Sequence, residues 1–212
     1  MRERPILFSG PMVRAILAGH KMQTRRAVKP PRSWDTQYPH CDPFVMPPAV
    51  WWWNGVHDRV GVRQACPYGQ PGDRLWVRET WMPDTPRDGT WADTQFFGCG
   101  MSPLSDIPEL YRKPEHCLYR ATWNGVGMVG WKPSIHMPRW ASRITLEITG
   151  VRVERLKDIS EDDAYAEGVK HSEHGGLTAR DGFQRLWESI NGAESWDKNP
   201  WVWVVQFRRI EA

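Results

Sequence analysis

The chain has 212 residues, and 28 Lys and Arg against 25 Asp and Glu leave a net charge of +3, too small to cause disorder by self-repulsion. Its 14 Trp, 18 Pro and 18 Gly are typical of a packed body with long, stiff loops. No apolar run approaches the ~18 residues of a membrane helix, and residues 1–10 lack the apolar core of a signal peptide. We therefore expect a single domain over 1–212, located in the cytoplasm and without a membrane partner.

The N-terminal segment 1–33 is basic. It carries eight Lys and Arg and one acid, Glu3, a local charge of +7 that leaves −4 for the rest of the chain. A basic segment beside a nearly neutral body suggests an anionic partner such as a nucleotide or RNA. A solvated charged surface explains the same residues equally well.

The first half of the chain predicts few regular elements. Pro11 suits the first turn of a short helix, and Gly19 suits the left-handed position that ends one. Residues 74–78 predict a strand after a Pro- and Gly-rich turn. The stretches 30–63 and 82–130 have no sustained period and are rich in proline, so we expect two long irregular insertions there.

The second half is patterned more clearly. Two alternating segments flank Gly150, which suggests a bulge, and Ser160 suits the N-cap of a helix that Gly168 ends. Strands with only three short helices predict an α+β, mostly β fold: a small barrel or curled sheet. The expected elements here are strands at 142–148, 151–156 and 201–210, and helices at 161–167 and 181–190.

The four cysteines form no C-x-x-C pair and show no structural-zinc spacing. We expect reduced thiols, no metal and no cofactor. The alternative is a zinc site that adds two histidines, since a His-Cys pair occurs twice. The residues concerned are Cys41, Cys66, Cys99, Cys117, His40 and His116.

The most compact polar cluster is Gly19-His-Lys-Met-Gln-Thr-Arg-Arg26. A lysine such as Lys21 can act as the base for a hydroxyl nucleophile such as Thr24 when burial or nearby cations lower its pKa. Arg25 and Arg26 can supply those cations. Lys, Thr and Arg are common on protein surfaces, so a purely structural role is the alternative.

The pattern G-x-K-x-x-T-x-R after a short helix resembles the signature of the ASCH domain family, whose fold is similar to the PUA barrel of RNA-binding proteins. The segments 71–77, 144–156 and 202–210 agree with that family in order. The segment Pro138-Arg-Trp-Ala-Ser-Arg-Ile-Thr-Leu146 looks like the longer ASCH proteins of phages and prophages. The resemblance implies a PUA-like β-barrel with a few short helices and insertions at 30–63 and 82–130.

One branch of that family consists of N4-acetylcytidine amidohydrolases, which use a threonine nucleophile, a lysine base and a glutamate acid. The resemblance assigns these roles to Thr24, Lys21 and, by alignment of the Ile-Ser-Glu segment, Glu167. Three nearby acids suit the positive N-terminus of the helix instead. They are Glu161, Asp162 and Asp163.

Further residues are candidates for substrate binding. Arg26 is expected to hold the substrate or stabilise an oxyanion. Trp51, Trp52 and Trp53, and Trp91, are expected either to stack on a base or to cover the core as a lid. His136 is a candidate proton carrier, although a structural histidine is the simpler reading.

The resemblance implies an enzyme that removes the acyl group from N4-acylcytidine or N4-acylcytosine, with a modified pyrimidine nucleoside or base, or RNA, as its partner. Two alternatives remain. One is a PUA-like RNA-binding module without catalysis, and the other is an ASCH-type ribonuclease in which Lys21 and Arg26 contact phosphate. The sequence predicts no oligomeric state.

Overall fold

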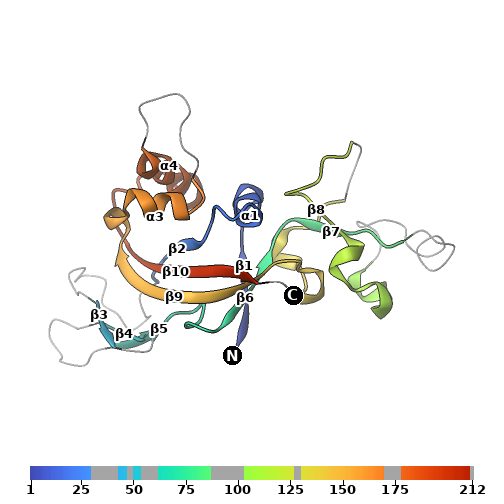
Figure 1. Cartoon of the computed structure of the whole chain (residues 1–212), viewed down its shortest axis with the longest axis horizontal. Helices are drawn as coiled ribbons and strands as arrows, with labels where there is room; N and C mark the ends of the chain where they lie inside the picture. The colour runs from blue at the N-terminus through green and yellow to red at the C-terminus, as the bar shows by residue number, and fades with distance from the viewer. Residues whose placement is uncertain are drawn as a thin grey trace. The chain divides into compact units, whose positions relative to one another are not determined.

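The computed structural model describes residues 1–29, 43–46, 50–53, 62–86, 103–126, 130–169 and 178–210. Its main element is a mixed five-stranded sheet with the strand order β1-β6-β9-β10-β2. Figure 1 colours these elements along the chain. The strands of this sheet are β1 (Glu3–Leu7), β2 (Gln23–Ala27), β6 (Arg74–Arg78), β9 (Thr145–Arg155) and β10 (Trp201–Ile210).

The described strands form no closed barrel, so of the two forms expected from the sequence, a small barrel or a curled sheet, the closed one is not found in this part of the chain. The strand order ends at β1 on one side and at β2 on the other. Beside β2, the backbone N–H of Met22 donates to the carbonyl of Ala166 at 2.8 Å. The edge next to Lys21 is therefore used by the end of a helix rather than by a closing strand. The broader prediction of an α+β fold with few helices is confirmed.

The chain divides into two compact units. Unit 1 consists of Met1–Arg2, Gly19–Arg74 and Glu147–Arg208, and unit 2 of Glu3–Ala18, Leu75–Leu146 and Arg209–Ala212. Each unit has a buried apolar cluster of its own. Phe183 and Trp187 belong to the cluster of unit 1, and Trp81 belongs to that of unit 2. The single-domain assignment stays a prediction.

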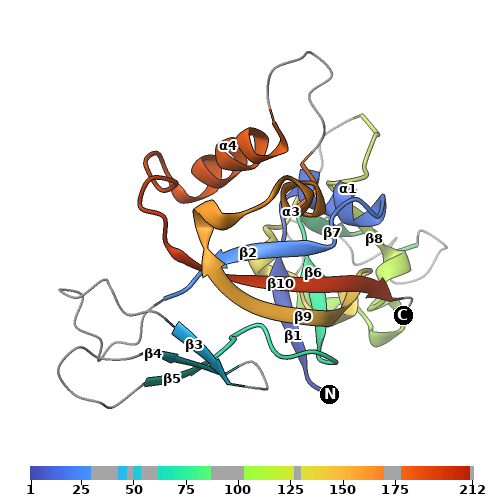
Figure 2. The ribbon, with the colours of Figure 1, turned by 60° about the vertical axis from the view of Figure 1, so that its left-hand side comes forward.

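Helices α3 (Glu161–Ala166) and α4 (Ala179–Asn191) belong to unit 1 and pack against each other. The predicted cap of α3 is confirmed, because Ser160 Oγ accepts from the backbone N–H of Asp163 at 3.1 Å. Gly168, at φ +86°, lies just beyond its end. α4 begins two residues earlier than expected, because Thr178 and Asp181 form a capping box. Figure 2 shows α3 beside β2, with β10 next to that strand and β9 beyond β10.

Strand β9 is continuous through Gly150, where the sequence suggests a bulge. A Cβ atom at Gly150 would lie 2.5 Å from Gln206 Oε1, the end of a flexible and exposed side chain, so a larger residue at this position would require Gln206 to move. The predicted strands at 74–78 and 201–210 are confirmed as β6 and β10. Helix α1 (Gly10–Leu17) is also confirmed, with Gly19 at φ +75° after its end.

The expected insertions contain regular structure that their patterns did not predict. Within 30–63 and the residues just after it, β3 (Pro43–Met46), β4 (Val50–Trp53) and β5 (Val62–Ala65) form a three-stranded sheet. Val and Trp favour strands, but a run of three Trp hides the alternation that signals one. In unit 2, β7 (Trp81–Pro83) pairs with β8 (Cys117–Tyr119).

The other regular elements in the described ranges are short 3-10 helices. None of the helices in the described ranges has the length and hydropathy needed to cross a bilayer. The 3-10 helices lie at Leu104–Asp106, Glu109–Tyr111, Pro114–His116, Ser134–His136, Arg139–Ala141 and Leu156–Asp158.

Candidate active site

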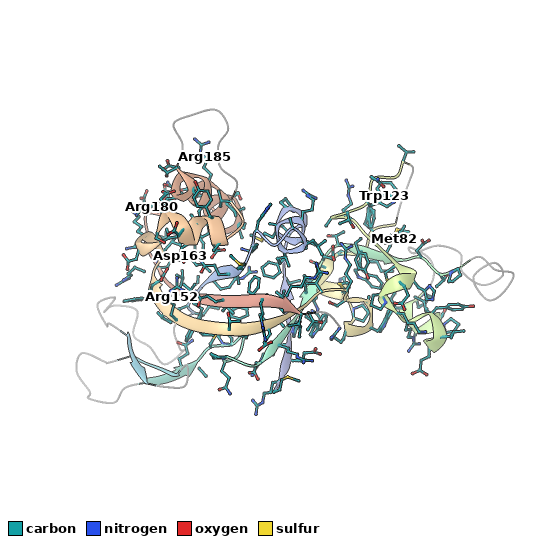
Figure 3. All side chains as sticks on the ribbon, in the orientation of Figure 1. Met82, Trp123, Arg152, Asp163, Arg180 and Arg185 are labelled. Carbon is teal, nitrogen blue, oxygen red and sulfur yellow. The ribbon has the colours of Figure 1, made fainter. Side chains whose placement is uncertain are left out.

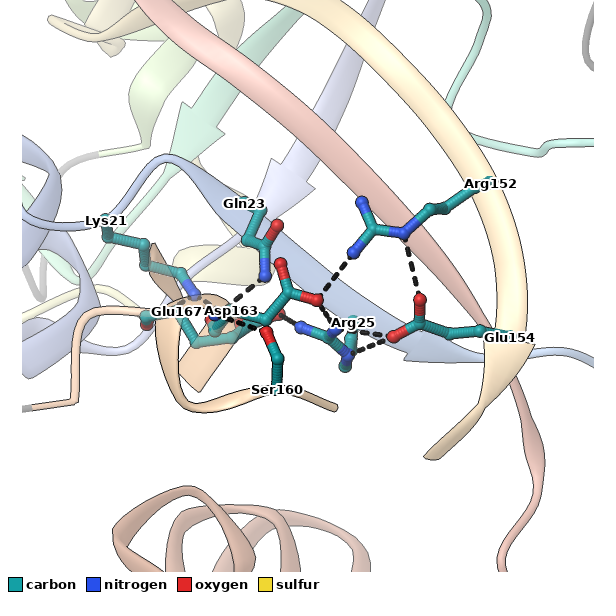
Figure 4. Close-up of polar contacts among 8 residues, drawn as sticks. All are labelled: Lys21, Gln23, Arg25, Arg152, Glu154, Ser160, Asp163 and Glu167. Atoms are coloured by element: carbon teal, nitrogen blue, oxygen red, sulfur yellow. Dashed lines mark hydrogen bonds and ion pairs between the residues drawn. The ribbon is translucent and has the colours of Figure 1, made fainter. Parts of the chain in front are cut away.

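Strand β2 in unit 1 carries the side chains on which the candidate site is built. It pairs antiparallel with β10 in a regular register that places Gln206 opposite Gln23. Successive side chains of a strand alternate between its faces, so Gln23 and Arg25 share one face. Figure 4 shows these two side chains and that of Lys21 directed toward α3. The polar face of β2 is therefore the face next to α3.

Lys21 and Glu167 meet in a direct contact. Lys21 Nζ donates to Glu167 Oε2 and to the Glu167 carbonyl oxygen, both at 2.8 Å. The backbones of the same two residues form an isolated antiparallel bridge. Lys21 is 2% exposed and Glu167 is 3% exposed. Because 146 residues separate them, the tertiary fold creates this contact.

Burial lowers the pKa of the Lys21 ammonium below its ordinary value of 10.5, because a cation in the interior loses its hydration. The nearby Glu167 carboxylate acts in the opposite direction, whereas Arg26 and Arg25 lower the pKa further. The direction of this shift is the one that the sequence predicts. A lysine whose pKa is lowered can accept a proton closer to neutral pH, which is what a general base requires.

Arg25 lies at the centre of a set of three carboxylates. Its Nη1 donates to Glu167 Oε1 at 3.1 Å, and its Nη2 donates to Asp163 Oδ2 at 2.7 Å. Its Nε donates to Glu154 Oε1 at 3.0 Å, and Nη2 contacts the same oxygen. The side chain of Arg25 is fully buried. The guanidinium therefore links the end of β9 with α3 and the residue that follows it.

Arg152 completes this polar cluster on its more exposed side. Its Nε donates to Glu154 Oε2 at 2.9 Å and its Nη2 donates to Asp163 Oδ2 at 2.7 Å. Figure 3 labels Arg152 and Asp163 in unit 1. Although burial raises the pKa of Asp163, the cations of Arg25 and Arg152 hold it below its ordinary value of 3.8. With Lys21, the cluster has three basic and three acidic side chains.

Thr24, the predicted nucleophile, lies between Gln23 and Arg25 in β2. It is 2% exposed. Because side chains alternate along a strand, the Thr24 side chain leaves β2 on the face opposite Arg25. Arg26, predicted to bind substrate, is partly buried and follows Arg25 in the strand. The structure thus joins Lys21 directly to Glu167 and places Thr24 on the other face of the strand.

The remaining candidates from the sequence are four tryptophans and His136. The backbones of Trp51, Trp52 and Trp53 form part of β4, but their side chains lie outside the described part of the structure. Trp91 also lies outside the described residues. His136 is exposed in a 3-10 turn of unit 2. Their roles stay predictions.

The described residues contain no group of three or more His, Cys, Asp or Glu side chains arranged to hold a metal ion. Cys66 and Cys117 are buried. Cys41, Cys99 and His40 lie outside the described ranges.

Sequence reasoning did not find the roles of Arg25, Glu154 and Asp163. Arg25 was counted among the cations of a basic segment, and Asp163 among the acids that suit a helix N-terminus. Asp163 does stand at the N-terminal turn of α3, but its carboxylate also binds Arg25 and Arg152. The one available signal was the low hydrophobicity of Gln23-Thr-Arg-Arg-Ala27, which is unusual for a strand whose first three residues are buried.

The arrangement can store and release a proton. Lys21 and Glu167 can exchange one proton across 2.8 Å, and Arg25 gives the carboxylate a second hydrogen-bond donor. A pair of groups that can donate and accept a proton is what general acid and general base catalysis requires. Comparison of the chain with family models, with curated proteins and with solved structures found no match in any of the three.

Proposed function

We propose that this protein is an ASCH-type amidohydrolase with a PUA-like fold that removes the acyl group from N4-acylated cytosine or cytidine. The observation that supports the proposal is the buried 2.8 Å contact between Lys21 Nζ and Glu167 Oε2. The resemblance names these two residues as base and acid, although they are 146 positions apart. Amide hydrolysis needs both groups in one site, because the nucleophile loses a proton while the leaving nitrogen gains one.

The Lys21–Glu167 pair can accept one proton and donate another, so that the number of protons on the pair stays the same. An ammonium beside a carboxylate and an amine beside a carboxylic acid differ only in the position of one proton. In the second form, Lys21 takes the proton of the attacking hydroxyl and Glu167 gives its proton to the cytosine N4 as the C–N bond breaks. The pair is then an ammonium and a carboxylate, and an acyl group is esterified to the nucleophile.

Water completes the cycle. Glu167 accepts a proton from the water that attacks the ester, and Lys21 returns a proton to the departing hydroxyl oxygen. The products are the carboxylic acid and the free amino group of the pyrimidine. General acid–base help of this kind contributes roughly 10²–10⁴-fold to the rate.

Thr24 is the proposed nucleophile, and its position sets a condition on this route. Its side chain leaves β2 on the face opposite Arg25, so the covalent route requires the Thr24 hydroxyl to come within hydrogen-bond distance of the Lys21 amine. Direct attack by a water molecule that Lys21 deprotonates needs no such contact. Replacing Thr24 by alanine separates the two routes, since only the covalent one requires its hydroxyl.

We further propose that Arg26 binds the substrate and that the tryptophans of β4 contribute to base stacking. The two nucleic-acid alternatives receive less support from the geometry. Lys21 and Arg25, two of the cations counted in the basic segment 1–33, are buried in ion pairs with carboxylates. They are therefore less able to contact phosphate than surface cations are.

The deciding experiment is incubation of the purified protein with N4-acetylcytidine, with chromatographic detection of cytidine. We expect release of cytidine by the wild type and a fall of about 10²-fold or more in kcat for Glu167→Gln. Thr24→Ala should lose turnover to a similar extent, and Thr24→Ser should retain part of it. Absence of cytidine with the wild type would contradict the proposed activity, and near-wild-type turnover by Thr24→Ala would leave water as the nucleophile.

A binding assay separates the alternatives. Affinity for RNA that falls steeply with salt would favour the RNA-binding module, because binding of a polyanion releases counterions. Turnover of a neutral nucleoside should change little over the same range of salt.

A further inference from the structure

Arg25 occupies a variable position of the G-x-K-x-x-T-x-R pattern, between the threonine and the final arginine. Nevertheless it contacts the same carboxylate as Lys21 does. Arg25 Nη1 donates to Glu167 Oε1, and Lys21 Nζ donates to Glu167 Oε2. Each oxygen of Glu167 therefore has its own cationic donor, and the two donors together define the plane of the carboxylate.

The guanidinium of Arg25 is itself held in place by other elements. Glu154 at the end of β9 binds its Nε, and Asp163 in α3 binds its Nη2. The ring of Phe183 in α4 packs with its centroid 5.8 Å from Arg25 Cζ. A planar guanidinium with three such neighbours has little freedom to rotate, because its donors are fixed in one fork.

We propose that Arg25 is a positioning residue that orients the Glu167 carboxylate so that Oε2 faces the Lys21 amine. This inference rests on the proposed function, since the orientation matters for catalysis only if Glu167 transfers a proton. Arg25 remains a cation throughout, because a guanidinium does not lose its proton in a protein. It therefore acts through Glu167 and transfers no proton itself.

The geometry points to orientation rather than to charge alone. A lysine at position 25 would keep the positive charge but would offer a single ammonium in place of the fork that serves three carboxylates. A purely electrostatic role would survive that change. An orienting role would not survive it, because Glu167 Oε1 would lose a donor in a fixed direction.

Three variants and one matched control test the proposal. Arg25→Gln removes the fork, and Arg25→Lys keeps the charge. Arg25→Gln/Glu154→Gln removes one cation and one carboxylate together, so that a folded protein is obtained even if the single variant unfolds. The control is Arg152→Gln, because Arg152 binds Asp163 and Glu154 but not Glu167.

We expect kcat to fall about 10–100-fold in all three Arg25 variants, because displacing a reacting group by about 1 Å has an effect of that size. KM should change by less than about threefold, since Arg25 does not bind the substrate in this proposal. Arg152→Gln should keep kcat within about threefold of the wild type, as expected of a partly exposed ion pair. Wild-type kcat in Arg25→Lys would overturn the orienting role, and equal losses in the Arg25 and Arg152 variants would reduce it to a structural one.

A second measurement does not depend on activity. Nuclear magnetic resonance titration of isotope-labelled lysine, assigned with Lys21→Arg, follows the protonation of Lys21. Among the described residues, Glu167, Arg26 and Arg25 are the charged groups that act on the pKa of Lys21. Removing the Arg25 cation should shift the Lys21 midpoint to higher pH in Arg25→Gln, with a smaller shift in Arg152→Gln.

The two readouts separate the failure of each proposal. An inactive wild type in which Arg25→Gln shifts the Lys21 titration would contradict the amidohydrolase activity but not the coupling of Arg25 to the pair. An active wild type with unchanged kcat and unchanged titration in Arg25→Gln would overturn the positioning role and leave the activity standing.

Discussion

Both units bury a glutamate against an arginine, but the two sites differ in what they can do with a proton. In unit 2, Arg143 donates to both oxygens of Glu79, at 2.9 and 3.1 Å, and its guanidinium lies 3.9 Å from the centroid of the Tyr119 ring. In unit 1, the oxygens of Glu167 are divided between Arg25 and Lys21. A guanidinium keeps its proton, whereas a buried lysine can lose it. The Glu79–Arg143 pair is therefore suited to stability, and the Lys21–Glu167 pair to chemistry.

The largest expected effect is on catalysis. Lys21→Met leaves an unbranched side chain that is one atom shorter and removes the amine, while Glu167 retains Arg25 as a partner. We expect kcat/KM for N4-acetylcytidine to fall about 10³-fold, because the base is lost. Steady-state kinetics measure this change. Lys29→Met is the matched control, since Lys29 is exposed just beyond β2, and equal activity of the two variants would refute the role of Lys21.

The corresponding change in unit 2 should affect stability. Glu79 is 1% exposed, so Glu79→Gln leaves Arg143 without its charged partner. Breaking a buried ion pair costs about 3–5 kcal/mol, and we expect the lower end because Arg143 retains some contact with solvent. Urea denaturation measures the change in free energy of unfolding. The folded variant should hydrolyse substrate at the wild-type rate; a stable but inactive variant would contradict the division of roles.

The two sites should also respond to pH with opposite signs. The Lys21 pKa in the folded state lies below 10.5, so the unfolded chain binds more protons in the window between the two values. Stability then rises with pH there, by up to about 1.4 kcal/mol per pH unit, and this contribution is lost as pH falls through the lowered pKa. Burial raises the pKa of Glu79 above 4.5, and its contribution is lost as pH rises through the raised pKa.

Urea denaturation at a series of pH values tests both signs. The difference in stability between wild type and Lys21→Met should grow from neutral pH toward pH 10.5. The difference between wild type and Glu79→Gln should shrink as pH rises from 4.5. Slopes of the same sign would show that one of the two groups is not shifted in the direction given.

The smallest expected effect concerns the two helix caps of unit 1. Ser160→Ala removes the cap of α3, and Thr178→Ala breaks the capping box of α4. Loss of a cap costs about 0.5–2 kcal/mol. We expect the loss of stability in Ser160→Ala to lie at the lower end of this range, because Arg25 and Arg152 also bind the first turn of α3 through Asp163. A larger loss for Ser160→Ala than for Thr178→Ala would show that these arginines add little to the docking of α3.

Local patterns predicted the elements whose signals are local. The Val- and Trp-rich composition of 201–210 predicted β10, and Gly19, Ser160 and Gly168 predicted the short helices. Strand β4 was missed, because adjacent tryptophans do not alternate. The described strands also do not close into a barrel, and nothing in the sequence shows that the backbone beside Lys21 bonds to the end of α3.

The candidate site divides in the same way. Lys21 and Glu167 were chosen through a resemblance, and the roles of both, and of Thr24, stay predictions. The contacts of Arg25 could not be predicted, because its carboxylate partners are more than 100 positions away in the sequence. These partners are Glu154, Asp163 and Glu167. Such charge pairing is a property of the folded chain, and the sequence predicted Arg25 only as a cation near Lys21.

The regular pairing of β2 with β10 limits how the length of this chain can vary. Inserting or deleting one residue within Gln23–Ala27 would turn Thr24 and Arg26 toward α3 and Gln23 and Arg25 away from it. Two extra residues would restore the faces but move Arg25 along the strand by about 7 Å, beyond the reach of its carboxylates. Length changes near the site are therefore tolerated only outside this strand. The proline-rich additions of this sequence begin at residue 30, after β2 has ended at Ala27.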